Sequence, residues 1–138
     1  MSSLAQLGSF RHGVHPAEHK DTSSLPVERL AFGRRYVLPL GQHIGAPSRP
    51  VVAVGAHVVR GQVVAEPGGY VSVALHSPVS GRVVAIAPRR HPHGQMQRAI
   101  EIEADPFASQ RMPPREAVDP KALSRDAFVQ HVQQAGLV

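Results

Sequence analysis

Glycines recur at close intervals in a valine-rich stretch between residues 51 and 87, and this spacing limits the fold more than any other feature. The pattern is V-x-x-G-x-x-V-x-x-G-Q-x-V over residues 52–64, followed by S-P-V-x-G-x-V over residues 77–83. Valine favours extended backbone, whereas glycine permits the tight turns and close backbone approaches that separate short strands. We therefore expect Gly55, Gly61 and Gly81 to stand at such points of a small all-β barrel or sandwich with a core of alternating valines.

The whole chain divides into three predicted parts, and the middle part contains this stretch. Residues 1–35 are polar and rich in turn formers, which predicts an extended arm that wraps or docks. Residues 36–104 are the predicted β domain, and residues 105–138 are a Pro-rich connector with a terminal helix. The predicted strands are Tyr36–Leu38, Val51–Val54, His57–Val59, Val63–Ala65, Tyr70–Val73, Arg82–Ile86 and Ile100–Glu103.

The terminal helix is expected to begin after Ser124, which is a suitable N-cap, with Asp126 in its first turn. Gly136 is a suitable C-cap residue. The apolar face of this helix is expected to contain Leu123, Ala127, Phe128, Val132 and Ala135.

Composition excludes several kinds of chemistry. The chain has no Cys, so it can form no disulfide, ligate no iron–sulfur cluster through thiolates and use no thiol nucleophile. Residues 1–10 have neither a charged region nor a long apolar run, so we expect no signal peptide. No stretch approaches the roughly 20 apolar residues that cross a bilayer, so we expect no direct membrane insertion.

Positive charge is concentrated in the middle of the chain. The net charge is +5, and between Arg29 and Arg98 there are nine Arg but only one acidic residue, Glu66. Such a domain would attract an acidic protein partner at long range, and salt would weaken the attraction. Nucleic acid is not expected, because basic grooves for single strands interleave stacking aromatics, and here only Phe32, Tyr36 and Tyr70 are available.

The glycine–valine skeleton resembles the barrel-sandwich hybrid, the fold of biotinyl and lipoyl carrier domains. In those carriers a Lys at an exposed hairpin tip takes the prosthetic group. The matching tip here is Glu66–Tyr70, and neither of the two lysines, Lys20 and Lys121, lies near it. Since covalent attachment needs an amine on that turn, we expect no carrier chemistry.

With the flanks added, the chain resembles the N-terminal region of RnfC, a subunit of the Rnf ion-translocating ferredoxin:NAD oxidoreductase, over roughly residues 10–138. The matching blocks, in order, are Gly13–Pro16, Glu18–Lys20, Leu38–Leu40, Gln42–Pro47, His76–Gly81, Ala87–Arg89 and His91–Pro92. Arg11 and His12 depart from the family, which tends to have a small residue before Gly13. The family-motif positions, expected to be structural or docking residues, are His15, Pro16, Lys20, Gln42, His43, Gly45, Pro47, Gly55, Gly61, Pro78 and Gly81.

The resemblance implies a non-catalytic scaffold or docking domain, peripheral at the cytoplasmic face of the bacterial inner membrane, with other subunits of the complex as partners. It also implies NADH- or FMN-type nucleotide binding and two 4Fe–4S clusters further along a full-length family member, after a helix like residues 123–135. No cofactor is expected in this chain. The alternative function is a stand-alone lipoyl/biotinyl-like adaptor barrel that lacks the attachment lysine.

Nine histidines and one carboxylate pair invite chemistry of their own. A zinc site is disfavoured, because Pro16 breaks any helix that would align His12, His15 and His19. We expect His15 and His43 to make backbone hydrogen bonds that hold the arm to the barrel, and His91 and His93 to lie in an exposed hairpin loop. Glu101 and Glu103 share one strand face and are interpreted as charges that protect a strand edge. No residue set has the nucleophile, base and orienter of an active site, so none is assigned as catalytic.

Overall fold

The computed structural model describes residues 19–114 and 117–137. Backbone contacts divide the chain into two units, residues 1–30 and 31–138. In the first unit, the N–H of Ser23 donates to the carbonyl of Lys20 at 2.9 Å and closes a turn. Residues 26–30 then continue without helix or strand, and the side chains of Val27 and Leu30 are almost fully exposed.

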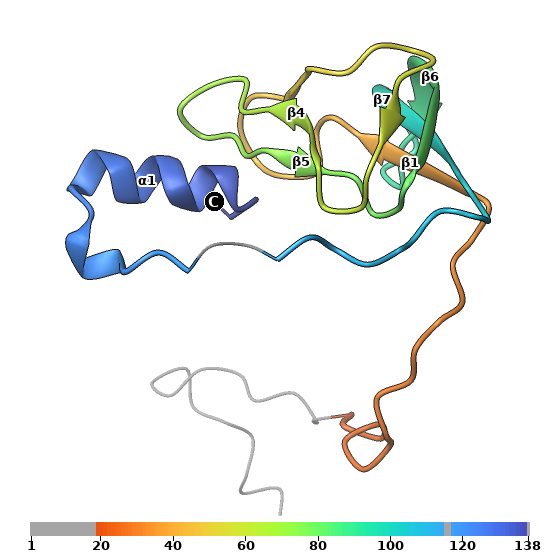
Figure 1. Cartoon of the computed structure of the whole chain (residues 1–138), viewed down its shortest axis with the longest axis horizontal. Coiled ribbons are helices and arrows are strands. Elements are labelled where there is room, and N and C mark those ends of the chain that lie inside the picture. Colours follow the sequence, from red (N-terminus) through yellow and green to blue (C-terminus); the bar gives the residue numbers. More distant parts are fainter. Residues whose placement is uncertain (1–18, 115–116, 138) are drawn as a thin grey trace, which may run out of the picture. The chain divides into compact units, whose positions relative to one another are not determined.

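The second unit is built on two antiparallel sheets (Figure 1). Sheet A has the order β1-β7-β6-β3, and sheet B has the order β2-β4-β5. The strands of sheet A are β1 (Arg35–Pro39), β3 (His57–Val58), β6 (Gly81–Arg90) and β7 (Met96–Ala104). The strands of sheet B are β2 (Arg49–Pro50), β4 (Val63–Glu66) and β5 (Leu75–His76).

The core between the sheets consists of aliphatic side chains, as the sequence predicts. Its buried members are Leu38, Leu40, Val58, Val64, Ala65, Val73, Leu75, Val79, Val83, Ile100 and Ile102. No aromatic side chain is among the buried members, and Tyr36 packs against their edge. Burial of each such aliphatic side chain contributes about 1.5–3 kcal/mol, which makes this cluster the main source of stability.

Two predicted strands are wrong. Residues 51–54 and 70–73 lie outside the strands, although both carry alternating valines. In the first segment, the N–H of Ala56 donates to the carbonyl of Ala53, and this turn links β2 to β3. In the second segment, backbone groups bond to residues 43–48 instead of a neighbouring strand. Val73 is buried and Val52 packs against the core, whereas Val54 is 59% exposed, so valine alternation alone reports neither strand pairing nor burial.

The three glycines of the repeat occupy the special positions predicted for them. Gly55 and Gly61 have φ angles of 90° and 84°, a region that L side chains rarely adopt. Gly81 begins β6, where a Cβ would lie 2.1 Å from the carbonyl oxygen of Glu103. Positive φ thus explains the first two glycines, and close strand packing explains the third.

The terminal helix, α1 (Arg125–Gln134), follows a 3₁₀ turn, η2 (Pro120–Ala122). Ser124 is its N-cap, as predicted, and its Oγ accepts from the N–H of Ala127 at 3.2 Å. Gly136, with φ 84°, ends the helix in a Schellman arrangement, in which the N–H of Leu137 donates to the carbonyl of Val132 at 3.1 Å. The predicted apolar face is only half-buried, and Phe128 remains 45% exposed.

The connector between β7 and α1 is fastened to the barrel by one glutamine. Gln110 Oε1 accepts from the N–H of Ser80 at 2.8 Å, and Gln110 Nε2 donates to the carbonyl of Ser80 at 3.1 Å. Arg60 Nη1 also donates to the Gln110 carbonyl at 2.8 Å. The part of the connector around Gln110 therefore packs against the turn before β6.

Candidate functional site

The segment Leu40–Ser48, which we call the strap, lies across the loop Pro67–Ala74, which we call the carrier loop because it matches the tip of carrier domains. The N–H of Ala46 donates to the carbonyl of Val71 at 3.0 Å. The hydroxyl of buried Ser48 donates to the carbonyl of Val73 at 2.7 Å. These bonds hold the middle of the strap against the second half of the carrier loop.

Two glycines permit the close contact between the strap and the carrier loop. Gly45 has φ 92°, and a Cβ there would lie 2.1 Å from the carbonyl oxygen of Val71. A Cβ on Gly68 would lie 1.9 Å from the carbonyl oxygen of Pro47. Both distances are far below van der Waals contact, so any larger residue would push the two segments apart.

His43 and Gln42 stiffen the strap from within. The N–H of Val73 donates to His43 Nε2 at 3.4 Å, so His43 Nδ1 carries the proton and donates to the carbonyl of Ile44 at 2.8 Å. Gln42 Nε2 donates to the carbonyl of Pro39 at 3.0 Å. His43 therefore makes the backbone hydrogen bonds predicted for it, but they tie the strap to the carrier loop and not the arm to the barrel.

The strap and α1 are both hydrogen-bonded to the backbone of the loop that corresponds to the attachment tip of a carrier domain, although the tip residues Gly69–Val71 remain exposed. The N–H of Ala74 donates to the carbonyl of Gln133 at 3.0 Å, and Gln133 Nε2 donates to the carbonyl of Tyr70. Figure 1 shows α1 beside the β4–β5 part of the barrel. The side chain of Tyr70 is 85% exposed, but the carbonyl groups of Tyr70 and Val71 accept hydrogen bonds from α1 and the strap. The loop contains no lysine, so it has no side-chain amine.

The remaining family-motif positions do not converge on this site. Gly55, Gly61 and Gly81 lie in the repeat described above, and Pro78 lies beside a shallow hollow near Gln42 and His43. Lys20 belongs to the other unit. His15 and Pro16 lie outside the described residues.

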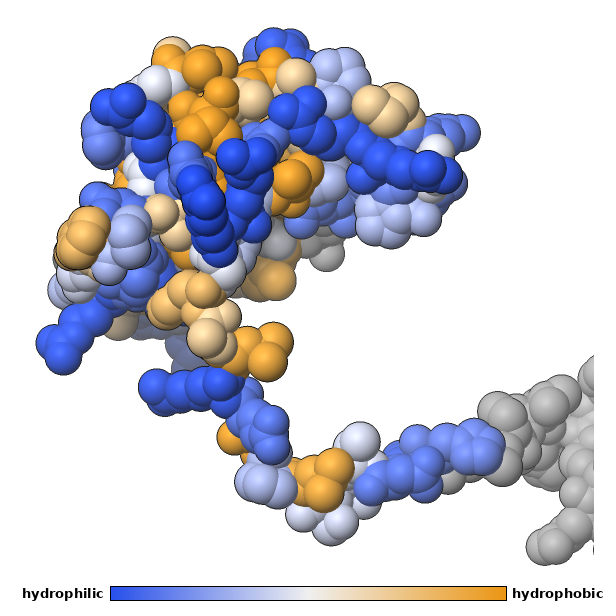
Figure 2. All heavy atoms as spheres, turned by 90° about the vertical axis from the view of Figure 1, so that its right-hand side faces the viewer, coloured by the Kyte–Doolittle hydropathy of each residue, from blue (hydrophilic) through white to orange (hydrophobic). Residues whose placement is uncertain are grey.

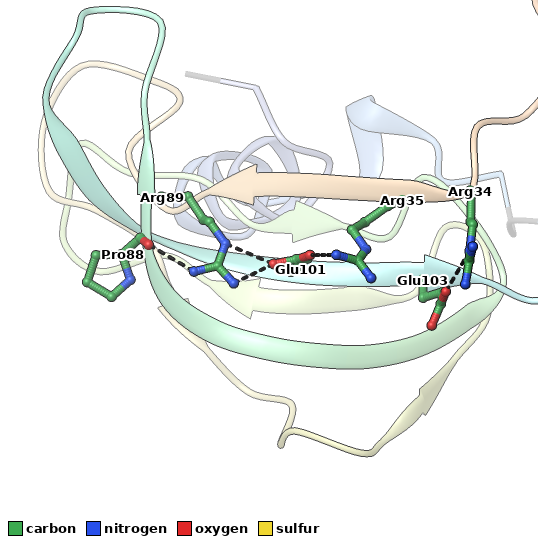
Figure 3. Close-up of polar contacts among 6 residues, drawn as sticks. All are labelled: Arg34, Arg35, Pro88, Arg89, Glu101 and Glu103. Atoms are coloured by element: carbon green, nitrogen blue, oxygen red, sulfur yellow. Dashed lines mark hydrogen bonds and ion pairs between the residues drawn. The ribbon is translucent and has the colours of Figure 1, made fainter.

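A carboxylate between two arginines is a feature that sequence reasoning misread. Glu101 lies on β7, an inner strand between β1 and β6, and is only 5% exposed. Arg35 Nη1 lies 3.0 Å from Glu101 Oε1, while Arg89 Nε and Nη2 donate to Glu101 Oε2 at 2.8 and 2.6 Å (Figure 3). The interpretation of Glu101 and Glu103 as edge protection is wrong, because β7 is paired on both sides and its carboxylates link neighbouring strands.

A hollow of about 930 Å³ beside Phe32, Arg82 and Phe107 has no free catalytic group among the described residues. The carboxylate of Glu103 accepts from Arg34 Nε at 2.9 Å, and Asp105 Oδ1 accepts from the N–H of Phe107. Arg82 Nη2 lies 3.2 Å from His57 Nε2, which makes that imidazole nitrogen an acceptor. Each of these groups thus has a structural partner, and the lining holds no Ser, Thr or Cys nucleophile.

Three further findings concern the histidines, metal ligands and helix length of the described ranges. His91 and His93 lie in the β6–β7 hairpin loop, as predicted, with ring centroids 4.3 Å apart. Over residues 19–114 and 117–137, no group of three or more His, Cys, Asp or Glu side chains could hold a metal ion. In the same ranges, no helix is long and apolar enough to cross a bilayer.

Sequence reasoning missed the buried serines and the glutamine clip. Ser48, Ser72, Ser77 and Ser80 are almost fully buried, and each supplies a hydroxyl to a backbone group of a turn or loop. Single polar residues among valines carry no periodic signal. Only the rule that buried polar groups are hydrogen-bonded could have suggested such partners.

These features define a carrier-type barrel whose presenting loop is hydrogen-bonded to the strap and α1 and has no attachment lysine. The comparison with protein families agrees with this class, since residues 8–106 match the family described as the RnfC barrel-sandwich hybrid domain. The chain belongs to this family.

Named relatives carry the same domain within longer proteins. The chain is 46% identical over 105 residues to the RnfC subunit of the ion-translocating oxidoreductase complex of Pseudomonas aeruginosa, covering 74% of this chain and 14% of that protein. It is 35% identical over 143 residues to the corresponding subunit of the Na(+)-translocating ferredoxin:NAD(+) oxidoreductase complex of Acetobacterium woodii, covering 95% of this chain and 30% of that protein. The chain therefore spans less than a third of the length of these relatives.

Proposed function

We propose that this chain is the non-catalytic scaffold and docking domain of an RnfC-like subunit in a membrane-associated ferredoxin:NAD oxidoreductase complex. Family membership supports the place in such a complex, since the relatives are named as subunits of oxidoreductase complexes. The carrying observation is the strap, which joins residues 45–48 to residues 68–73 through hydrogen bonds and close backbone contacts. A barrel closed in this way is suited to holding neighbours in a fixed orientation.

Within this proposal, the redox groups belong to other parts of a longer subunit. The donor set of this chain does not fit an iron–sulfur cluster, because it contains no Cys. Its glycine turns lie between β segments and do not open a helix, as a phosphate-binding loop would require. NADH- or FMN-type nucleotide binding and two 4Fe–4S clusters are accordingly proposed for the region that follows the barrel in full-length family members.

The parts of the chain have separate roles in this scheme. Residues 36–104 form the barrel, residues 105–138 form the connector and helix that lead toward the nucleotide-binding region, and residues 1–35 form a docking arm. Val27 and Leu30, 99% and 92% exposed, are suited to contacts with another subunit. The full-length protein would lie peripherally on the cytoplasmic face of the inner membrane.

The experiment is an affinity tag on the chromosomal gene of the source cells, with purification of the tagged product in mild detergent. We expect a polypeptide several times larger than 14.8 kDa that co-purifies with integral-membrane electron-transfer subunits. A tagged product near 14.8 kDa without such partners would overturn the proposal. It would favour the alternative, a stand-alone adaptor barrel without the attachment lysine.

A further inference from the structure

The arginines of the barrel fall into two groups when their partners are traced. Arg34, Arg35 and Arg89 pair with Glu101 or Glu103. Arg60 donates to the Gln110 carbonyl and lies 4.9 Å from the ring centroid of Phe32, and Arg82 contacts His57. The side chains of Arg49, Arg90 and Arg98 have no such ion pair or hydrogen bond within the described residues, and we call these three the arginine face.

The three residues of the arginine face belong to neighbouring segments. Arg49 and Arg98 line one open hollow of about 390 Å³ together with Leu40, Pro47 and Gln97. On the β6–β7 hairpin, Arg98 is opposite Pro88 and Arg90 is opposite Met96. Because side chains alternate along a strand, Arg90 and Arg98 project from the same side of the hairpin as diagonal neighbours.

Few negative charges oppose this face. Glu66 lies across the β2–β4 ladder from Arg49, but it forms no ion pair with it. The carboxylates of Glu101 and Glu103 are already engaged. The three arginines of this face therefore form a positively charged surface whose charges are not neutralised by ion pairs within the described residues.

Two other features suit this face to a protein partner. Met96, 64% exposed, stands among the arginines as an apolar contact, and Met and Arg are both enriched at interfaces. Gln97 also lines the hollow, and its Oε1 is buried near Gly41 with no hydrogen-bond partner within residues 19–114 and 117–137. A buried acceptor without a hydrogen bond raises the free energy of the folded protein. If the side-chain amide of Gln97 rotates toward the hollow, an N–H group of a docked chain can donate to its Oε1. Figure 2 shows the side of the protein that lies at the right of Figure 1, and there blue hydrophilic and orange apolar side chains are interleaved.

We propose that the arginine face binds an acidic segment of another protein subunit. This inference rests on the proposed docking function and names the chemistry of the partner. Guanidinium groups bind carboxylates through paired N–H donors, and backbone N–H groups of a peptide supply the donor that Gln97 lacks. A nucleic-acid strand fits poorly, because no aromatic ring lines the hollow for stacking.

The test uses the same tagged product purified from the source cells, with the double variant Arg49→Glu/Arg98→Glu. We expect co-purification of the membrane subunits at low salt to fall at least about tenfold relative to the parent, and this difference to shrink as salt is raised, because salt screens the charges of the arginine face. The matched control is Arg111→Glu/Arg125→Glu, which changes the charge equally at exposed positions away from the hollow. The amount of membrane subunits that co-purifies with the control should stay within about twofold of the amount found with the parent protein, because exposed charges outside the interface contribute little to binding. Melting temperatures of both variants that equal the melting temperature of the parent protein would show that folding is unchanged.

A photo-crosslinking residue in place of Met96 identifies the occupant. Mass spectrometry of the adduct should give a peptide with several Asp or Glu residues close together. An adduct to lipid or nucleic acid, to a neutral or basic peptide, or no adduct at all would overturn the inference. If the parent protein loses its partners, the proposed function itself fails. If the parent and the Arg49→Glu/Arg98→Glu variant retain them equally, only the arginine face is refuted.

Discussion

Replacing Glu101 with Gln tests whether the buried carboxylate stabilises sheet A. The change keeps the shape of the side chain but removes the charge that faces Arg35 and Arg89. Arg89, with its side chain 38% exposed, makes two hydrogen bonds to one carboxylate oxygen, while Arg35 is 57% exposed. Hydrogen bonds to charged groups contribute about 1.5–3 kcal/mol when enclosed, whereas exposed ion pairs contribute about 0–1 kcal/mol.

The expected loss follows from these exposures. Breaking a fully buried ion pair costs about 3–5 kcal/mol, but both guanidinium groups can regain water here. We therefore expect Glu101→Gln to lower the free energy of unfolding by about 2–3 kcal/mol. For a unit of this size, that corresponds to a melting temperature roughly 8–15 °C lower.

Urea unfolding followed by circular dichroism measures this difference directly. The matched control is Arg34→Met, which removes the exposed partner of Glu103 and should cost no more than about 1 kcal/mol. The reasoning is refuted if the free energy of unfolding of Glu101→Gln lies within about 0.5 kcal/mol of the value for the parent. In that case the attraction between Glu101 and its two arginines only offsets the cost of removing the carboxylate from water.

Three further outcomes are expected. Gly68→Ala should destabilise the barrel by about 2 kcal/mol or more, because its Cβ would meet the Pro47 carbonyl; an unchanged urea midpoint would show that the strap yields easily. Ser124→Ala removes the N-cap of α1 and should cost about 1 kcal/mol, visible as faster amide exchange in the helix but not in the core strands; equal exchange would contradict the capping role. Tyr70→Lys places an exposed amine on the carrier loop, yet intact mass should show no lipoyl or biotinyl adduct, because the strap and α1 occupy the loop; a modified fraction would mean that modifying enzymes can reach it.

Local chemistry made parts of the fold predictable. Glycines at positive φ, a serine N-cap and a Gly C-cap are each decided by neighbouring residues, so Gly55, Gly61, Ser124 and Gly136 take the expected positions. The aliphatic core follows from valine spacing in the same way.

Contacts between distant segments could not be predicted from the sequence. Residues 51–54 and 70–73 have a strand-like pattern, but their backbone partners are set by how the barrel closes. The position of β7 inside sheet A decides that Glu101 is buried, and no local pattern reports the order of strands. The Gln42–Pro47 block is recognisable as a family motif, but its role as the strap depends on residues 68–73.

The strap also has a consequence for entropy. A carrier domain presents a lysine on an exposed hairpin tip, and the long arm formed by that side chain and its prosthetic group must keep its freedom of motion. In this barrel the backbone of the same loop is hydrogen-bonded to the strap, so a partner that docks there would have less of the loop left to order. The strap therefore turns a loop adapted to reaching many positions into a surface adapted to holding one.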